Sequence, residues 1–183
     1  MSAPVWNLDA SDGRLLVTTG VTGRAARLGH RLTIAVNAWH AEVAWAGGEP
    51  VSVALTVEVS SLEVLRGEGG VKGLSAPEKA LARSNALGVF DADRYPQIRF
   101  TADDIEKTDG GYRIVGTLQI HGTAREHVIH LRVEDRRDTW RMSCETEVRH
   151  SEFGLKPYSM FVGSMKVIDE VTVSFTAQRR KDT

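Results

Sequence analysis

Residues 116–125, with the sequence GTLQIHGTAR, join two runs of alternating apolar residues. Apolar side chains occupy every second position on both sides of this stretch, and Gly116 falls in phase with them. The alternating positions are Tyr112, Ile114, Leu118, Ile120, Ile129, Leu131 and Val133. A period of two is typical of strands that bury one face. Because Gly122 tolerates the backbone angles of a tight turn, the stretch predicts an antiparallel hairpin.

The apolar pattern also predicts a pairing register for this hairpin. A four-residue loop at residues 122–125 pairs Leu118 with Ile129 and His127 with Ile120. All apolar positions of the two strands then share one face, whereas a shift of one residue would turn every side chain to the other face. We therefore expect this register, with His127 on the inward face near one end of the hairpin.

Length and charge limit the class of protein. The chain has 183 residues, which suits one domain or one large β-barrel. A chain of this length can bury roughly 70% of its unfolded surface, enough for an apolar core without disulfides. Its 24 acidic and 23 basic residues nearly balance, which argues against a broad nucleic-acid-binding surface. We expect a single domain at residues 1–183, with its core at about residues 12–178.

The sequence shows none of the usual targeting features. Residues 1–9 have no basic start and no apolar run, so no signal peptide is visible. No stretch approaches the roughly 20 apolar residues of a membrane-spanning helix. The single cysteine, Cys144, excludes an internal disulfide and is compatible with a reducing compartment. We therefore expect a cytoplasmic protein without a transmembrane segment.

Six further strands are predicted outside the hairpin. They cover residues 15–19, 32–45, 51–60, 140–149 and 171–178, together with a strand that begins at residue 98. In the longest of them the apolar phase changes at Asn37 and Ala38, which favours one strand with a β-bulge at that point. Two separate strands are the weaker alternative, because no strong turn residue intervenes.

One helix is predicted after the third strand. Ser75 precedes Glu78 by three residues, which is the spacing of a capping box, and Pro77 suits the first helical turn. Gly88 is the expected end of the helix. The elements together predict an all-β fold, in which eight antiparallel strands close into a barrel with one short α-helix inserted between strands 3 and 4. The interior of such a barrel is filled by side chains or holds one small ligand.

Several short motifs follow one another along the chain. They are Phe90-Asp91, Tyr95-Pro96, Ile98, Phe100, Gly116, Leu118, Ile120-His121-Gly122, Arg125, Phe153-Gly154, Val162-Gly163, Asp169 and Val171. In this order and spacing, over roughly residues 12–178, they resemble the YceI-like family of lipocalin-like barrels, which are associated with binding polyisoprenoids. The resemblance implies an eight-stranded lipocalin-like β-barrel with a helix beside it. It also implies a long apolar pocket for an isoprenoid or a similar amphiphilic lipid.

We expect a protein that binds or carries such a lipid, is not an enzyme and needs no cofactor. The expected ligand-binding residues are Ile34, Val36, Phe100, Leu118, Ile120, His127, Ile129, Leu131, Met142, Val148, Phe153 and Phe175. Apolar walls suit a lipid chain because the contact is non-directional and scales with area, at about 25 cal/mol per Å². Two alternatives stay open: an enzyme that uses His127, where the family usually has valine, and a packed barrel that acts only through its surface. A homodimer is open as well.

A glycine-rich segment at residues 66–73 precedes the helix. Gly73 follows Lys72 where a phosphate-binding P-loop needs serine or threonine, so the segment does not predict a P-loop. We expect a plain surface connection. The alternative is a flexible lid whose Arg66 or Lys72 meets a polar headgroup.

The six histidines do not predict a metal site. The expected register keeps the histidines of the hairpin apart, whereas metal ligands must converge with a defined geometry. We therefore expect no intrinsic metal. Cys144 lies in phase with Trp140 and Met142, which predicts a packing role for its side chain rather than a nucleophilic one.

Overall fold

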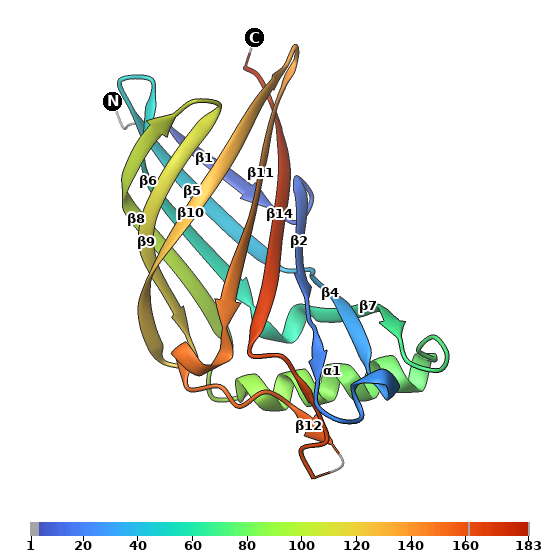
Figure 1. Cartoon of the computed structure of the whole chain (residues 1–183). Helices are drawn as coiled ribbons and strands as arrows, with labels where there is room; N and C mark the ends of the chain where they lie inside the picture. Colours follow the sequence, from blue (N-terminus) through green and yellow to red (C-terminus); the bar gives the residue numbers. More distant parts are fainter. Residues whose placement is uncertain (1–3, 161, 183) are drawn as a thin grey trace.

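Strands make up most of the structure. The computed structural model describes residues 4–160 and 162–182. Within this part of the chain a curled antiparallel sheet forms a barrel-like wall, and α1 (Ala76–Phe90) lies across one end of it (Figure 1). The strands of this sheet are β1 (Val5–Asp9), β2 (Gly13–Thr18), β4 (His30–Val36), β5 (Trp39–Ala46), β6 (Glu49–Glu58), β7 (Leu62–Gly69), β8 (Gln97–Thr108), β9 (Gly111–Ile120), β10 (Thr123–Arg136), β11 (Thr139–Arg149) and β14 (Glu170–Arg180).

The strand order confirms the predicted fold class but not the predicted strand count. The order across the main sheet is β1-β5-β6-β8-β9-β10-β11-β14-β2-β4-β7, with antiparallel pairing throughout. A second, three-stranded sheet has the order β12-β13-β3. Its strands are β3 (Val21–Thr22), β12 (Ser159–Met160) and β13 (Met165–Val167). The described residues therefore hold more strands than the eight predicted, because the predicted strand at residues 32–45 divides in two and because β1, β3, β7, β12 and β13 were not predicted.

The hairpin of β9 and β10 exists, but its predicted register is wrong. The turn consists of only two residues, His121 and Gly122, with φ angles of 53° and 72°. Positive φ at both central residues is what a type I′ hairpin turn requires. As a result Leu118 pairs with Arg125, and His127 pairs with Gly116. Each partner is displaced by four positions, and since this number is even, every side chain keeps the face that the sequence predicted.

The predicted long strand at residues 32–45 is instead two strands. β4 pairs with β2 and β7, whereas β5 pairs with β1 and β6, at the other end of the strand order. The apolar phase change at Asn37 and Ala38 marks this division and is not a bulge. The 3₁₀ helix η2 (Val59–Ser61) divides β6 from β7 in the same way. Backbone hydrogen bonds from Asn37 N to Ser61 O (3.2 Å) and from Glu58 N to Ala38 O (3.0 Å) join the two bends, so one bent hairpin links both ends of the sheet order.

Helix α1 begins as predicted and ends later than predicted. The Ser75 hydroxyl accepts a hydrogen bond from the Glu78 amide, and the Glu78 carboxylate accepts one from the Ser75 amide, which completes the capping box. Gly88 does not end the helix, which continues to Phe90 and is capped by Asp91 with a φ of 48°. An aspartate tolerates this left-handed conformation better than most residues, so the helix needs no glycine at its cap.

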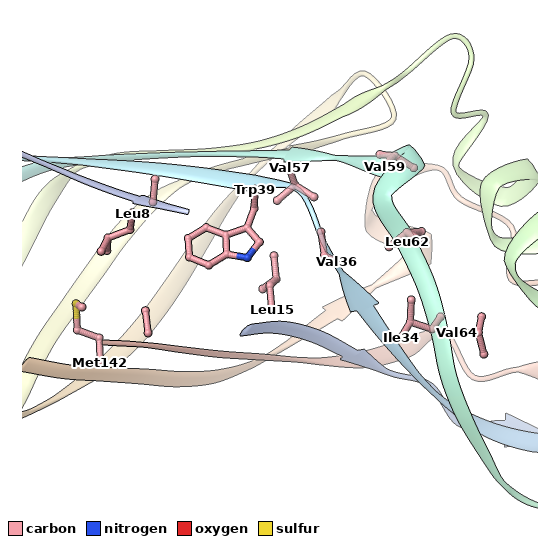
Figure 2. Packing of buried hydrophobic residues seen from close by; sticks show 12 residues of the cluster. Leu8, Leu15, Ile34, Val36, Trp39, Val57, Val59, Leu62, Val64 and Met142 are labelled. Atoms are coloured by element: carbon pink, nitrogen blue, oxygen red, sulfur yellow. The ribbon is translucent and has the colours of Figure 1, made fainter. Parts of the chain in front are cut away.

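The buried residues form two apolar clusters. The first surrounds Trp39, which is 4% exposed and lies among the side chains of Leu8, Leu15 and Val57 (Figure 2). The Trp39 ring also contacts the Phe175 ring edge-to-face at 5.3 Å. The second surrounds Phe153, a residue of the 3₁₀ helix η3 (His150–Phe153) that is 1% exposed. Side chains from the strands and from the 3₁₀ helices η2 and η3 fill both clusters, so only part of the barrel interior is left for a ligand.

Candidate functional site

A cavity of about 320 Å³ lies at the end of the barrel away from α1. Its walls come from the strand ends near the β5–β6, β8–β9 and β10–β11 turns, which lie on the same side as the chain termini (Figure 1). The lining residues are Trp6, Val43, Trp45, Gly48, Glu49, Pro50, Val53, Ile105, Lys107, Tyr112, Ile114, Leu131, Val133, Trp140 and Met142. Most of these side chains are apolar or aromatic, as in ordinary small-molecule sites.

Aromatic side chains and a cation lie beside one another at the cavity rim. The rings of Trp6 and Trp45 are 4.4 Å apart between centroids, with an interplanar angle of 45°. The guanidinium carbon of Arg179 lies 4.7 Å from the Trp6 ring centroid, within the range of a cation–π interaction. Nε1 of Trp45 and Nε of Arg179 are buried and have no hydrogen-bond partner among the described residues. Arg179 does not line the cavity itself and meets its wall through Trp6, whereas Trp45 is a lining residue whose donor has no partner in the described part of the chain.

A second polar group lines the cavity near the β5–β6 turn. The Glu49 carboxylate accepts hydrogen bonds from Lys107 Nζ and from the Tyr112 hydroxyl, each at 3.0 Å. These bonds lower the pKa of Glu49 below its ordinary value. Burial, and secondly the Glu49 carboxylate, raise the pKa of Tyr112. Near neutral pH the group therefore consists of an anion, a cation and a neutral phenol.

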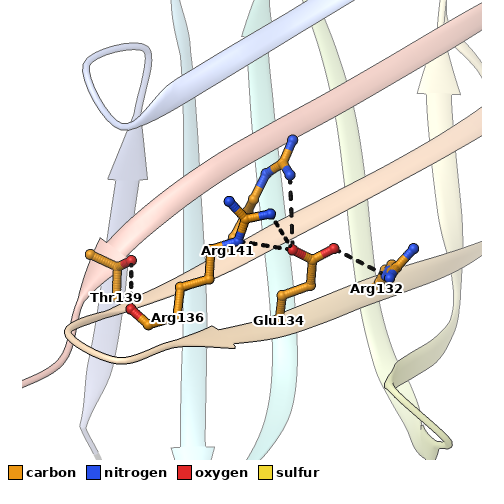
Figure 3. A network of polar contacts seen from close by, with 5 residues as sticks. All are labelled: Arg132, Glu134, Arg136, Thr139 and Arg141. Atoms are coloured by element: carbon orange, nitrogen blue, oxygen red, sulfur yellow. Dashed lines mark hydrogen bonds and ion pairs between the residues drawn. The ribbon is translucent and has the colours of Figure 1, made fainter.

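An ion cluster supports the strand end that carries Trp140. Glu134 on the outer face of β10 contacts Arg136 Nη2 at 2.7 Å, Arg132 Nε at 3.2 Å and Arg141 Nη1 at 3.9 Å (Figure 3). Hydrogen bonding to Arg136 is the main cause of the lowered Glu134 pKa. Because Glu134 pairs with Arg141 in register, the cluster joins β10 to β11 beside the position where Trp140 enters the cavity wall.

The structure places the predicted ligand-binding residues in three different surroundings. Leu131 and Met142 line the cavity. Ile34, Val36 and Phe175 belong to the first apolar cluster. The second cluster contains Phe100, Leu118, Ile120, Ile129, Val148 and Phe153. The predicted cavity beside Leu118 and Ile129 is therefore not where the 320 Å³ cavity lies, because Phe153 from η3 packs against these strands.

His127 lies off the cavity and has a partner within the protein. Its Nε2 is 2.8 Å from the Thr146 hydroxyl, and its strand position is opposite Gly116 rather than the predicted Ile120. Burial lowers the pKa of His127, and the nearby Glu152 carboxylate opposes that shift. Burying a polar ring costs less when it is hydrogen-bonded, so the bond to Thr146 stabilises the partly buried imidazole.

The two predicted headgroup contacts also lie away from the cavity. Arg66 is part of β7 and not of a loop, and its Nε lies 3.2 Å from the Glu68 carboxylate on the surface. Residues 66–69 pair with β4 although two of them are glycines. Strand pairing uses backbone N–H and C=O groups, which glycine keeps. Lys72 is exposed, and its carbonyl is 2.6 Å from His30 Nε2.

The described residues offer little else for metal binding or nucleophilic chemistry. They contain no group of three histidine, cysteine or acidic side chains that could hold a metal ion. Burial raises the pKa of Cys144 to about 11, which disfavours the thiolate that a nucleophile needs. In the same residues, no helix is both long and apolar enough to cross a lipid bilayer.

An antiparallel sheet curled around an apolar cavity, with a helix across one end, places the protein among the lipocalin-like barrels. The YceI-like domain matches residues 6–179. The chain therefore belongs to the YceI-like family, and the resemblance seen in its sequence is confirmed.

Solved structures share the fold at low sequence identity. The crystal structure of BcnA from Burkholderia cenocepacia has a TM-score of 0.70 and 17% identity, and the match covers 94% of this chain and 99% of BcnA. The YceI protein of Campylobacter jejuni has a TM-score of 0.59 and 15% identity, with 79% of this chain and 82% of that chain covered. Among curated proteins, no sequence matches this chain.

Proposed function

We propose that the protein binds an isoprenoid-like or other amphiphilic lipid in the cavity at the open end of the barrel. The apolar part of the ligand contacts Val43, Leu131 and Met142, and its polar end lies at the rim beside Arg179 and Trp45. One observation carries the proposal: an apolar cavity with a buried donor on the lining residue Trp45, and a second on Arg179, which packs on the lining residue Trp6, neither donor having a partner among the described residues. Residues 6–179 act as one binding unit in this proposal.

The size of the cavity limits the ligand. A volume of about 320 Å³ lies near the lower end of the roughly 300–1,000 Å³ of ordinary small-molecule pockets. The two apolar clusters fill other parts of the interior. We therefore expect a short amphiphile, or one end of a longer chain, in this cavity.

The proposed role is binding or carriage without catalysis. His127, which would carry the enzyme alternative, is hydrogen-bonded to Thr146 and does not line the cavity. A role in the cytoplasm is consistent with the single cysteine, and the proposed binding does not depend on the compartment.

Titration with farnesol, followed by tryptophan fluorescence, tests this proposal, because three tryptophans line the cavity. Leu131→Gln places an amide on the cavity wall and should raise the Kd about tenfold, since burying a leucine contributes roughly 1.5–3 kcal/mol. His130→Gln is the matched control, because His130 precedes Leu131 on the same strand but is exposed. Equal affinities of Leu131→Gln and the unmodified protein would exclude this cavity as the binding site.

A further inference from the structure

A projecting structure lies at the opposite end of the molecule from the cavity. Residues 20–29, 156–160 and 162–168, here called the basic tip, comprise β3, β12, β13 and the 3₁₀ helix η1 (Ala26–Leu28). Hydrogen bonds from the Ala25 amide to Ser164 O (2.7 Å) and from the Ile168 amide to Gly20 O (3.0 Å) hold its segments together. Figure 1 shows β12 projecting beyond α1, at the end of the molecule away from the β8–β9 and β10–β11 turns.

Exposed apolar side chains gather on the basic tip. They are Leu28, Tyr158, Met160, Val162 and Ile168. Val162 is fully exposed and has a φ of 54°, a conformation that β-branched residues normally avoid. Single exposed apolar residues are ordinary, but a group of them bordered by charges marks an interaction surface.

The charges on the basic tip have one sign. Arg24, Arg27, Lys156 and Lys166 are exposed, and residues 13–41 and 153–168 contain no aspartate or glutamate. None of these four cations forms an ion pair within residues 4–160 and 162–182. The whole chain has a formal net charge of −1, so this concentration of positive charge is local.

From this arrangement we propose that the basic tip docks the protein on an anionic phospholipid surface. Apolar side chains at a projecting turn can enter the boundary between headgroups and acyl chains, while neighbouring cations meet the lipid phosphates. A lipid surface yields around a convex tip, whereas a protein partner would need a pocket shaped to receive it. The cavity opens at the other end of the barrel, so docking leaves it accessible from solution. The proposal does not depend on what the cavity binds.

Flotation of the full-length chain with two kinds of vesicle tests the proposal. We expect binding to vesicles of phosphatidylcholine mixed with phosphatidylglycerol, much weaker binding to phosphatidylcholine alone, and weakening by added salt. Arg24→Gln combined with Lys166→Gln should lower the affinity about fivefold for each charge removed. Val162→Asn should also lower it while keeping the fold, because asparagine tolerates the left-handed conformation of this residue.

Matched substitutions at the far end of the barrel test whether the loss of vesicle binding depends on the position of the removed residues. They remove the same charge or the same apolar side chain away from the basic tip. Arg113→Gln combined with Arg180→Gln removes the same net charge, and Val51→Asn replaces another exposed valine. Both controls should bind vesicles like the unmodified protein, and the tip variants should still bind farnesol. Absence of binding to phosphatidylglycerol vesicles would overturn the proposal and leave an acidic protein as the partner to seek. Equal losses of vesicle affinity in the tip variants and in the control variants would also overturn the proposal.

Discussion

His127 shows how a partly buried polar side chain is held in this barrel. Its position opposite Gly116 meets no side chain across the strand pair, and the Thr146 hydroxyl bonds to Nε2 at 2.8 Å. Without such a partner, a buried polar group costs about 1–3 kcal/mol. The sequence predicted the inward face for His127 correctly, because an even shift of register leaves the face unchanged. It did not predict Thr146, which lies on a strand whose position depends on the whole sheet.

We predict that His127 makes stability depend on pH. Burial lowers its pKa below the ordinary 6.5 in the folded state. As the pH falls below 6.5 the unfolded chain binds a proton that the folded chain does not, so the free energy of unfolding decreases until the folded pKa is passed. His127→Gln keeps a hydrogen-bonding group and should flatten this dependence. Denaturant titrations at a series of pH values measure the effect.

His130→Gln is the control for the pH experiment. His130 lies on the same strand but is exposed, so its substitution should leave the slope of stability against pH unchanged. A slope that stays the same in His127→Gln would show that other groups cause the pH dependence.

At the scale of single elements, periodicity predicted faces well and pairings poorly. The alternation in β9 and β10 defines which side chains turn inward, but any even displacement satisfies it equally. The turn decided between the alternatives: both His121 and Gly122 adopt positive φ, which favours the two-residue loop. Histidine is less common than asparagine or glycine at such positions, so the residues of this turn predict its two-residue loop only weakly.

The division of residues 30–46 has a similar cause. The change of phase at Asn37 and Ala38 was visible in the sequence, but a bulge and a bend between two parts of a sheet produce the same pattern. Only the partners of β4 and β5 distinguish them, and those partners lie far away in the chain. β1 was missed because it has only five residues, although Trp6 and Leu8 already alternate with Asn7 and Asp9.

Two glycines test how tightly the elements pack. A Cβ atom at Gly116 in β9 would lie 2.5 Å from Thr101 O and 2.6 Å from Phe100 Cζ, whereas one at Gly88 in α1 would meet nothing within 4 Å. We predict that Gly116→Ala lowers the free energy of unfolding by about 1–3 kcal/mol through overpacking. Gly88→Ala should raise it by about 0.5–1 kcal/mol, because alanine favours the helix.

Chemical denaturation of the two glycine variants measures both changes, and each variant is the control for the other. If the Gly116→Ala variant were as stable as the unmodified protein, β8 and β9 would be able to move apart without a cost in free energy. Such a result would contradict the close contact of Gly116 with Phe100.

For the whole molecule, the sequence predicted a barrel with an apolar interior but not where the interior is open. Apolar faces look alike whether side chains fill the space between them or enclose it. Phe153, from a 3₁₀ helix after β11, fills the region around Leu118, and no periodicity reveals such a contact. The cavity lies instead where Trp6, Trp45 and Trp140 meet. These three residues come from separate strands, so only the curl of the whole sheet brings them together.

Cys144 offers a measure of how the whole barrel opens. It pairs with Phe175, is partly buried, and has a pKa raised to about 11 by burial. Because the thiolate is the reactive form, we predict that a thiol-specific disulfide reagent modifies the folded protein far more slowly than the unfolded chain at neutral pH. The rate should rise with denaturant in parallel with global unfolding. Farnesol bound in the cavity should lower the rate of Cys144 modification in the folded protein, since a ligand of the folded state suppresses unfolding.

The matched control moves the thiol by one position along β11. Glu145 is exposed, so Glu145→Cys in a Cys144→Ser background should react rapidly in the folded protein and respond little to denaturant or farnesol. If Cys144 itself reacted as rapidly without denaturant, the interior would exchange with solvent by a local opening of the wall. The cavity rim would then not be the only route by which a ligand reaches the apolar interior.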